Sequence, residues 1–443
     1  MRDYGGVTEA FRETWLAHRA AAVPDRLALR TSGADLTFSE LEAEATAAAE
    51  RLCGEGVVEG SIVPLDMPPS PEFVAHVHAL AKLGAVAEPV RPGAAPQGAG
   101  VPPTTGETSD APRKTRAIGT FASSETPDAL CRLYTSGTTG EPRAVDLTRE
   151  NFFYSAVGSA FALGVGPQDR WLCCVPLDHV AGFSILTRSA IYGTGFVLHD
   201  GFDVDRVAAS FCEDGVTLVS LVATQLIRLL EADVDLTGPR AIILGGGPVP
   251  VEALEEATGR GATVIQVYGM TETTSQVTLL EPADAERKAG SAGRPLLGAQ
   301  IEIDEGEILV RGPVVAPASV GEDGWLRTGD LGTIDDEGYL WVDGRLGDLI
   351  VTGGENVMPE RVEETLRSHP DVLDAAVVGR PDPQWQEAVS AVVVLRPGAT
   401  EDAEALRTHC AGELAGYEVP KHFAFVADLP RTASGKLMRS VLR

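Results

Sequence analysis

A run of glycine and hydroxyl residues between positions 134 and 143 could bind phosphate. The run, YTSGTTGEPR, begins with the last three residues of a predicted strand, ALCRLYTS, and continues beyond it. Glycine permits close backbone approach to a ligand, and hydroxyl groups donate hydrogen bonds to phosphate oxygens. The spacing is not that of a Walker A loop, and ordinary turns use the same residue types, so the run alone leaves both interpretations open. The candidate phosphate-binding residues are Thr135, Ser136, Gly137, Thr138, Thr139, Gly140 and Arg143.

Further segments with chemically useful side chains follow in order along the chain. They are YGMTE (268–272), WLRTGD (325–330), GRLGD (344–348), GGEN (353–356) and PRTASGK (430–436). Together with the run at 134–143, they resemble the signature motifs of the acyl-adenylate-forming superfamily, which includes acyl-CoA synthetases, luciferases and peptide-synthetase adenylation domains. The resemblance covers essentially the whole chain. It implies an enzyme that uses ATP and Mg²⁺ to activate a carboxylic acid as acyl-AMP and then transfers the acyl group to coenzyme A.

Adenylation joins a carboxylate oxygen to the α-phosphorus of ATP, so two anions approach each other and positive charge must be supplied. The resemblance implies that Glu272 holds Mg²⁺ and that Thr271 donates to the α-phosphate. It also implies that Asp330 accepts hydrogen bonds from the ribose hydroxyls, with support from Arg345. The other implied nucleotide contacts are Gly245, Gly246, Gly247 and Pro248 along the adenine, and Tyr268, Gly269 and Met270 in the motif of Glu272.

Lys436 is expected to be the principal catalytic residue of adenylation. It is one of five lysines in a chain that otherwise uses arginine. A compact ammonium can reach both the carboxylate and the α-phosphate while the bond between them forms. The alternative is a solvated lysine, which the surrounding PRTASGK motif disfavours.

The sequence departs from the superfamily pattern at two positions. The phosphate loop usually ends in Pro-Lys, and here Arg143 follows proline, which keeps the positive charge. The hinge position, two residues after Arg345, is Gly347, and glycine tolerates large dihedral changes. In relatives the C-terminal domain rotates at this hinge between the two half-reactions. One orientation presents the lysine, and the other brings the loop with Gly353 and Gly354 to the tunnel of the thiol substrate.

Three segments resemble, more finely, the o-succinylbenzoate–CoA ligases of menaquinone biosynthesis. They are PLDHVAGFS (176–184), YGMTETTSQV (268–277) and GSAGRPL (290–296). The substrate of such ligases carries a second, unreactive carboxylate, which we expect the guanidinium of Arg188 to bind. His179 would line and gate the acyl pocket; a surface arginine and a buried structural histidine are the respective alternatives. A fatty-acid or aryl-acid CoA ligase, or a stand-alone adenylation enzyme for a carrier protein, stays open, whereas a non-catalytic nucleotide binder would lack Lys436 or Glu272.

The elements that must position these residues form an α/β protein of two domains. Residues 36–53 and 71–84 are predicted helices, the first entered through Thr37 or Ser39. SIVPLDM and AVAEPV are predicted strands on either side of the second helix, which gives a parallel βαβ unit. Strand and helix patterns alternate to about residue 293, and an antiparallel, barrel-like part follows. We expect an N-terminal AMP-binding domain at 1–344, with layered sheets and helices, and a small mobile α+β domain at 345–443.

Composition excludes several classes of protein. The formal net charge is −28, from 64 acidic and 36 basic residues, which argues against nucleic-acid binding. Acidic residues spread along the whole chain indicate a halophilic enzyme, since about 1 M salt shortens the Debye length to about 3 Å. No apolar stretch is long enough for a membrane span, and no signal segment is visible, so a cytoplasmic location is expected. The six cysteines are predicted to be buried, reduced thiols. Homo-oligomerisation stays possible.

Overall fold

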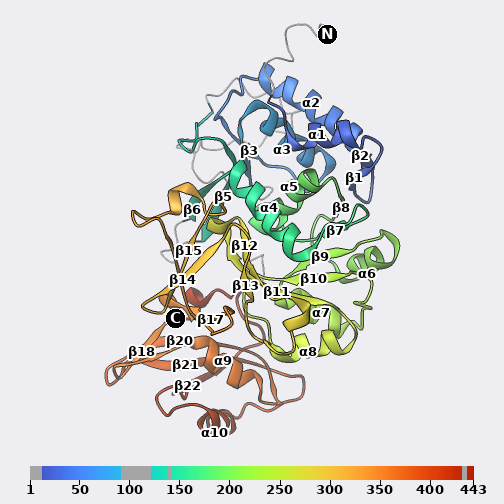
Figure 1. Ribbon diagram of the computed structural model, residues 1–443. Coiled ribbons are helices and arrows are strands. Elements are labelled where there is room, and N and C mark those ends of the chain that lie inside the picture. Colours follow the sequence, from blue (N-terminus) through green and yellow to red (C-terminus); the bar gives the residue numbers. More distant parts are fainter. Residues whose placement is uncertain (1–11, 91–120, 137–141, 432–436) are drawn as a thin grey trace, which may run out of the picture.

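The computed structural model describes residues 12–90, 121–136, 142–431 and 437–443. Figure 1 shows a large α/β body and, below it, a smaller part formed by the C-terminal residues. Among the described residues, no helix combines the length and apolar character that a membrane crossing requires. Residues 92–115, which are rich in Pro, Gly, Thr and Ala and are predicted from sequence to be a mobile surface connection, lie outside the described residues.

The largest sheet in the described part of the chain has nine strands and a parallel centre. Short, fully buried apolar strands such as β8 (Gly195–Leu198) and β10 (Ala241–Leu244) form this centre, as expected for a sheet that helices cover on both faces. The order across the sheet is β13 (Arg294–Pro295), β12 (Ser275–Leu279), β11 (Val264–Met270), β10 (Ala241–Leu244), β9 (Leu218–Leu221), β7 (Arg170–Cys173), β8 (Gly195–Leu198), β1 (Leu27–Arg30) and β2 (Asp35–Thr37).

Two hydrophobic cores lie on the two faces of this sheet. Side chains of β7 alternate between them, because Trp171 and Cys173 join one core and Leu172 joins the other. The second core is closed by α6 (Val204–Glu213), α7 (Ala223–Glu231) and α8 (Val251–Gly259). The first is closed by α1 (Trp15–Ala22), α4 (Arg149–Leu163) and α5 (Val180–Tyr192), together with the elements of a second sheet.

The second sheet has the order β3 (Ile62–Leu65), β4 (Val86–Pro89), β5 (Ala129–Ser136) and β6 (Pro142–Thr148). The predicted parallel βαβ unit is confirmed, since β3 and β4 are parallel and α3 (Pro71–Leu83) joins them. The helix α2 (Phe38–Gly54) begins after Thr37, which forms a capping box with Glu40. Of the two predicted entry residues, Thr37 is therefore the cap.

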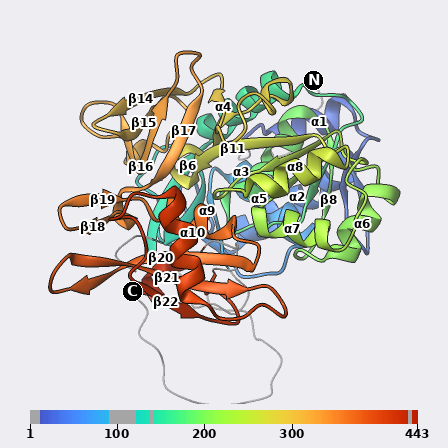
Figure 2. The ribbon, with the colours of Figure 1, turned by 90° about the horizontal axis from the view of Figure 1, so that it is seen from below.

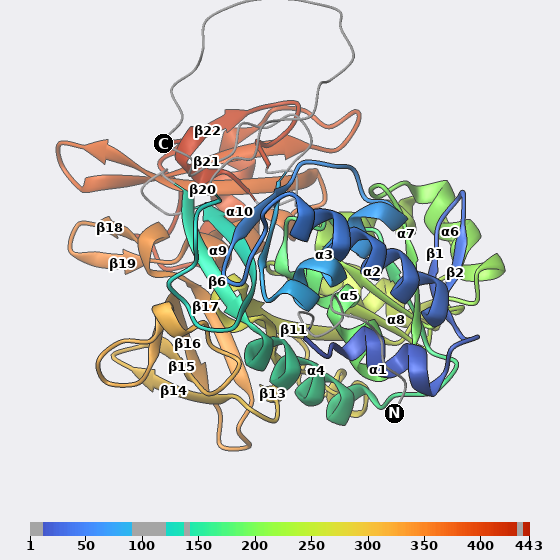
Figure 3. The same ribbon diagram turned by 90° about the horizontal axis from the view of Figure 1, so that it is seen from above.

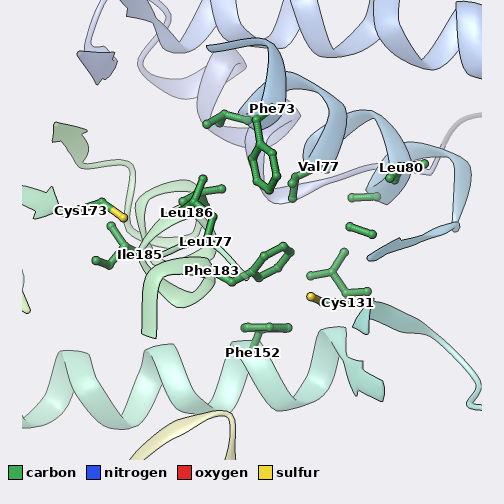
Figure 4. Packing of buried hydrophobic residues seen from close by; sticks show 14 of the residues in the cluster. Phe73, Val77, Leu80, Cys131, Phe152, Cys173, Leu177, Phe183, Ile185 and Leu186 are labelled. Atoms are coloured by element: carbon green, nitrogen blue, oxygen red, sulfur yellow. The ribbon is translucent and has the colours of Figure 1, made fainter. Parts of the chain in front are cut away.

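The core between α3, α4 and α5 fixes the position of α5. Figure 4 shows Phe73, Val77 and Leu80 of α3 facing a cluster around Phe183 of α5. The rings of Phe152 and Phe183 lie 5.4 Å apart between centroids, so α4 packs directly on α5. Removing this contact area from water stabilises α5 along most of its length, which matters because α5 carries Arg188.

The predicted change to antiparallel strands after residue 293 is confirmed. Strands β14 (Gln300–Asp304), β15 (Glu307–Arg311), β16 (Leu326–Ile334) and β17 (Leu340–Arg345) form an antiparallel sheet. Figures 1 and 3 place β6 beside this sheet. The contact brings the second sheet next to the end of the β14–β17 sheet.

The C-terminal residues form a separate α+β unit with its own hydrophobic core. Figure 2 shows α9 (Pro359–Arg367) and α10 (Ala403–Glu413) packed on its sheet. The strands are β18 (Ile350–Thr352), β19 (Glu355–Val357), β20 (Val372–Asp382), β21 (Gln386–Leu395) and β22 (His422–Phe425). The chain therefore has the predicted large N-terminal and small C-terminal parts.

All six cysteines are free thiols, as predicted, but their predicted burial is only partly correct. Cys131, Cys173, Cys174 and Cys410 are buried, whereas Cys53 and Cys212 are exposed. Both exposed residues lie on the outward faces of amphipathic helices, α2 and α6, where the apolar stripe does not include them.

Candidate active site

The candidate phosphate-binding residues lie on a β-hairpin. Thr135 pairs with Arg143, and Ser136 pairs with Pro142, across β5 and β6. The Thr135 hydroxyl donates to the Arg143 carbonyl at 3.5 Å. The predicted contacts Gly137, Thr138, Thr139 and Gly140 lie outside the described residues. Strand β6 contacts the turn that carries Glu272, so the hairpin and this carboxylate belong to one region.

Glu272 lies on a 3₁₀ turn, Thr271–Thr273, at the end of β11. The Met270 N–H donates to the Thr273 hydroxyl at 2.9 Å, and the Glu272 carbonyl accepts from the Ala316 N–H at 2.8 Å. These bonds hold the turn from both sides, and the Glu272 side chain stays partly exposed. A fixed, accessible carboxylate of this kind suits a Mg²⁺ ligand. Within the described ranges, no group of three or more metal-ligating side chains is present.

Gly269 allows the chain to reverse immediately after this turn. A Cβ atom at Gly269 would lie 1.8 Å from the Ser275 carbonyl oxygen, which no other residue type could accept without moving the backbone. Thr274 and Ser275 have φ angles of 53° and 82°, in the left-handed region that side chains disfavour. Strained backbone next to Glu272 indicates that the surrounding structure holds this turn in place.

Tyr268, Asp330 and Arg345 meet where β11 approaches the β14–β17 sheet. The Tyr268 hydroxyl donates to Asp330 Oδ2 at 2.8 Å, and Arg345 Nε lies 3.4 Å from Asp330 Oδ1. Asp330 and Arg345 are register partners on β16 and β17, which explains how residues 15 positions apart come together. Burial and the Asp330 charge raise the pKa of Tyr268, so its hydroxyl keeps its proton and donates to the carboxylate.

The predicted adenine loop, Gly245–Pro248, follows β10. Because β10 and β11 are parallel neighbours, this loop and Tyr268–Met270 lie at the same edge of the sheet. A Cβ atom at Gly245 would lie 3.0 Å from Val267 Cγ2, and Gly246 has a φ of 82°. The loop therefore runs close to β11, at an edge where open α/β sheets bind ligands.

Arg188 is buried, with 2% of its surface exposed, which contradicts the surface alternative. Its Nη2 donates to the Ser155 hydroxyl at 3.2 Å, and that hydroxyl donates to the Thr274 carbonyl at 2.7 Å. The guanidinium also lies 5.5 Å from the centroid of the Trp171 ring. Two hydrogen bonds thus connect Arg188 with the residue that directly follows the Glu272 turn.

Among the described residues, no carboxylate forms an ion pair with Arg188, and its buried Nε has no hydrogen-bond partner. Burial accordingly lowers the pKa of Arg188 from its usual value. A buried cation without a protein anion is energetically costly, and bound ligands frequently supply the missing charge. Arg188 therefore has the properties of an anion-binding residue.

His179 precedes α5 and is half-buried. Its carbonyl accepts from the Phe183 N–H at 3.1 Å, but its side chain does not cap the helix. A Cβ atom at Gly182 would lie 2.3 Å from the Pro176 carbonyl oxygen, so glycine is required where α5 begins to pack on the preceding loop. His179 is thus held at the start of the helix that carries Arg188.

Two predicted groups are not brought to this site by the described residues. Lys436 lies outside them. Gly353 and Gly354 form the turn between β18 and β19, and the Gly353 N–H donates to the Trp385 carbonyl at 2.8 Å within the C-terminal unit. Sequence reasoning missed Ser155 and Trp171, because a serine within α4 and a tryptophan within a strand carry no signal of their own.

This fold is that of adenylate-forming enzymes, and the chain belongs to the AMP-binding enzyme family. The family matches residues 16–102 and 99–318, and the AMP-binding enzyme C-terminal domain matches residues 361–436. The 2-succinylbenzoate–CoA ligase of Bacillus cereus is 38% identical over 473 aligned positions, which cover 97% of each chain.

Solved structures of o-succinylbenzoate CoA synthetase (MenE) from Bacillus subtilis are similar over nearly the whole chain. The complex with the acyl-adenylate OSB-AMP has a TM-score of 0.86 at 35% identity, with 98% of each chain covered. The complex with ATP and magnesium has a TM-score of 0.85 at 36% identity, covering 97% of this chain and 99% of that one. A double mutant bound to the product analogue OSB-NCoA has a TM-score of only 0.68 at 36% identity and 98% coverage of each chain.

Replacing Gly269 with alanine should destabilise the Glu272 turn. The added methyl group meets the Ser275 carbonyl at 1.8 Å, so we expect a loss of about 3 kcal/mol in the free energy of unfolding. Chemical denaturation of both proteins measures this difference. The control is Gly259→Ala, since a Cβ atom there meets nothing within 4 Å. Equal stability of Gly269→Ala and Gly259→Ala would contradict the steric argument.

Proposed function

We propose that the protein activates 2-succinylbenzoate with ATP as the acyl-adenylate and transfers the acyl group to coenzyme A, a reaction of menaquinone biosynthesis. The observation that carries the proposal is the buried cation Arg188. It has no carboxylate partner among the described residues, and two successive hydrogen bonds connect it to Thr274, the residue after the Glu272 turn. The relatives of known activity, which are similar over nearly the full length, support the same substrate.

In the first half-reaction, a carboxylate oxygen of the acid attacks the α-phosphorus of ATP, and the bond from that phosphorus to pyrophosphate breaks. The hairpin of Thr135 and Arg143 would hold phosphate oxygens, and Glu272 would hold the Mg²⁺ that neutralises them. Asp330, positioned by Tyr268, would accept hydrogen bonds from the ribose. In the second half-reaction, the thiol of coenzyme A attacks the acyl carbon, loses its proton, and AMP leaves.

The second carboxylate of the substrate would bind to Arg188. Its guanidinium already uses Nη2 for Ser155, and the unpartnered Nε supplies a further donor. A succinyl side chain carries one carboxylate away from the ring carboxylate, so one can react at the phosphate while the other pairs with Arg188. A monoacid would leave the cation buried and uncompensated, which makes Arg188 a source of selectivity.

The C-terminal unit would deliver Lys436 for adenylation and the Gly353–Gly354 turn for thioester formation. We place the boundary between residues 344 and 345, with Gly347 as the pivot. The TM-scores with the ATP and acyl-adenylate complexes are higher than the TM-score with the OSB-NCoA complex, at nearly equal coverage. This difference supports the adenylation orientation of the two domains for this structure.

Removing the guanidinium should impair the diacid substrate selectively. For Arg188→Ala we expect kcat/KM of adenylation with 2-succinylbenzoate to fall about 10- to 100-fold, as a lost charge-assisted hydrogen bond predicts. The rate with benzoate should change less than about threefold, because benzoate lacks the second carboxylate. Pyrophosphate release with each acid, without coenzyme A, measures both values.

Two controls define the outcome of this experiment. Arg240→Ala removes an arginine that pairs with Asp169 at 2.8 Å at the amino end of β10, and it should leave the selectivity unchanged. Equal losses for 2-succinylbenzoate and benzoate in Arg188→Ala would remove Arg188 from the substrate site. A wild-type protein that forms no acyl-AMP from 2-succinylbenzoate would refute the proposed function itself.

The two half-reactions should separate in a lysine variant. Lys436→Ala should lose most of the adenylation rate, about 100-fold or more, because the variant lacks the ammonium group that would stabilise the negative charge of the transition state. The variant should retain much of the rate of thioester formation from synthetic acyl-AMP. Single-turnover assays of each half-reaction measure the split, and an equal loss in both would refute the assigned role.

We also propose that the acidic surface is an adaptation to a salt-rich cytoplasm. At a net charge of −28, self-repulsion should destabilise the folded protein where it is unscreened. The melting temperature should therefore rise between low salt and about 1 M KCl, where the Debye length is about 3 Å. A melting temperature and activity that are already maximal in salt-free buffer would contradict this proposal.

A further inference from the structure

Arg439 is the centre of a buried ion cluster in the C-terminal unit. It opens the short 3₁₀ turn Arg439–Val441, and only 14% of its side chain is exposed. Nη2 lies 2.8 Å from Glu363 Oε2 and 2.9 Å from Glu360 Oε1. Nη1 lies 3.2 Å from Asp348 Oδ2. One guanidinium therefore joins helix α9 to the turn Leu346–Asp348, which contains the proposed pivot.

Removing this guanidinium would leave three carboxylates close together. Burial raises the pKa of Glu360, as do the charges of Glu363 and Asp348, whereas Arg439 lowers it. Arg443, which is half exposed, adds a second tie, since its Nη2 donates to the Gly347 carbonyl at 3.0 Å. The cluster thus depends on Arg439, and without it like charges would push α9 and the pivot turn apart.

The segment that contains Arg439 also pairs with the chain that precedes residues 432–436. Arg431 and Leu437 form an antiparallel bridge, and the Met438 N–H donates to the Pro430 carbonyl at 2.9 Å. Lys436 precedes Leu437 directly in the chain. Arg439, two residues after Leu437, therefore joins the chain that directly follows Lys436 to the pivot turn.

The cluster touches the large N-terminal part at one further point. A Cβ atom at Gly344 would lie 2.5 Å from Glu360 Oε2, so this carboxylate packs directly against the backbone of β17. Glu360 Oε2 is buried and has no hydrogen-bond partner among the described residues. The ion cluster is thus seated against the last strand before the pivot in the present arrangement.

We propose that Arg439 is a positioning residue for the adenylation half-reaction, because it ties the chain that directly follows Lys436 to the pivot turn. The role rests on the proposed function, because it acts through Lys436 and matters only where this lysine must reach the α-phosphate. Arg439 itself does not touch substrate. Thioester formation, which does not use the lysine, should depend on it much less.

The test compares both half-reactions in Arg439→Ala, Arg439→Lys and Asp348→Asn. Adenylation of 2-succinylbenzoate should fall about 100-fold in Arg439→Ala, the cost of roughly 1 Å misplacement, with the KM for ATP changed less than about threefold. Thioester formation from synthetic acyl-AMP should change less than about threefold. Arg439→Lys should restore part of the adenylation rate, and Asp348→Asn should lower it about 10-fold by removing the negative charge on the pivot turn that Arg439 and Arg443 share.

The matched control is Arg407→Ala, which removes another ion-paired arginine of the same unit. Arg407 pairs with Glu404 and stacks 5.4 Å from the Phe423 ring centroid, far in sequence from the pivot, so both half-reactions should stay unchanged. Equal losses in both half-reactions of folded Arg439→Ala would overturn the proposal. If that variant does not fold, an unchanged adenylation rate in Asp348→Asn overturns it. Absence of acyl-AMP in the wild type would instead refute the proposed function.

Discussion

The geometry of the site depends on an approach between two backbone segments that only glycine permits. At the end of β11, the chain turns through Thr271–Thr273 and returns along β12, with the Gly269 Cα pressed against the Ser275 carbonyl. The reversal places Glu272 at the sheet edge and aims the Thr274 carbonyl toward α4. The proposed magnesium ligand Glu272 and the contact of Thr274 with the Ser155–Arg188 pair are therefore set by the same three-residue turn, and a shift of that turn would move both.

The positively charged side chains of this acidic protein differ in the groups that balance their charge. Arg439 meets three carboxylates of the protein and serves its internal geometry. Lys82 is paired with Glu42, and Lys288 lies 2.7 Å from Asp335. Arg188 is the exception among the buried cations described, because it contacts a hydroxyl and an aromatic ring instead of a carboxylate. In a protein with a large excess of acid, a buried arginine without a carboxylate partner among the described residues supports the proposed role in binding a substrate anion.

Sequence patterns predicted the elements better than they predicted the contacts between them. The strand at 129–136 and the helix at 71–83 match their predictions closely, because buried apolar runs and helix caps are local signals. The turn that carries Glu272 has no such signal, since it depends on left-handed Thr274 and Ser275 held by tertiary contacts. The burial of Arg188 was equally invisible, because α5 is covered on nearly all sides by elements that lie far away in the sequence.

The cost of burying Arg188 is also what would make it selective. Burying a cation without an anion destabilises the ligand-free protein, and a bound carboxylate would recover most of that free energy. A diacid would recover this energy on binding, whereas a monoacid would desolvate the pocket and leave the cation unpaired. Discrimination would then come less from extra contacts with the correct substrate than from an uncompensated charge that the wrong substrate leaves in place. A carboxylate of the protein beside Arg188 would stabilise the fold and remove that discrimination at the same time.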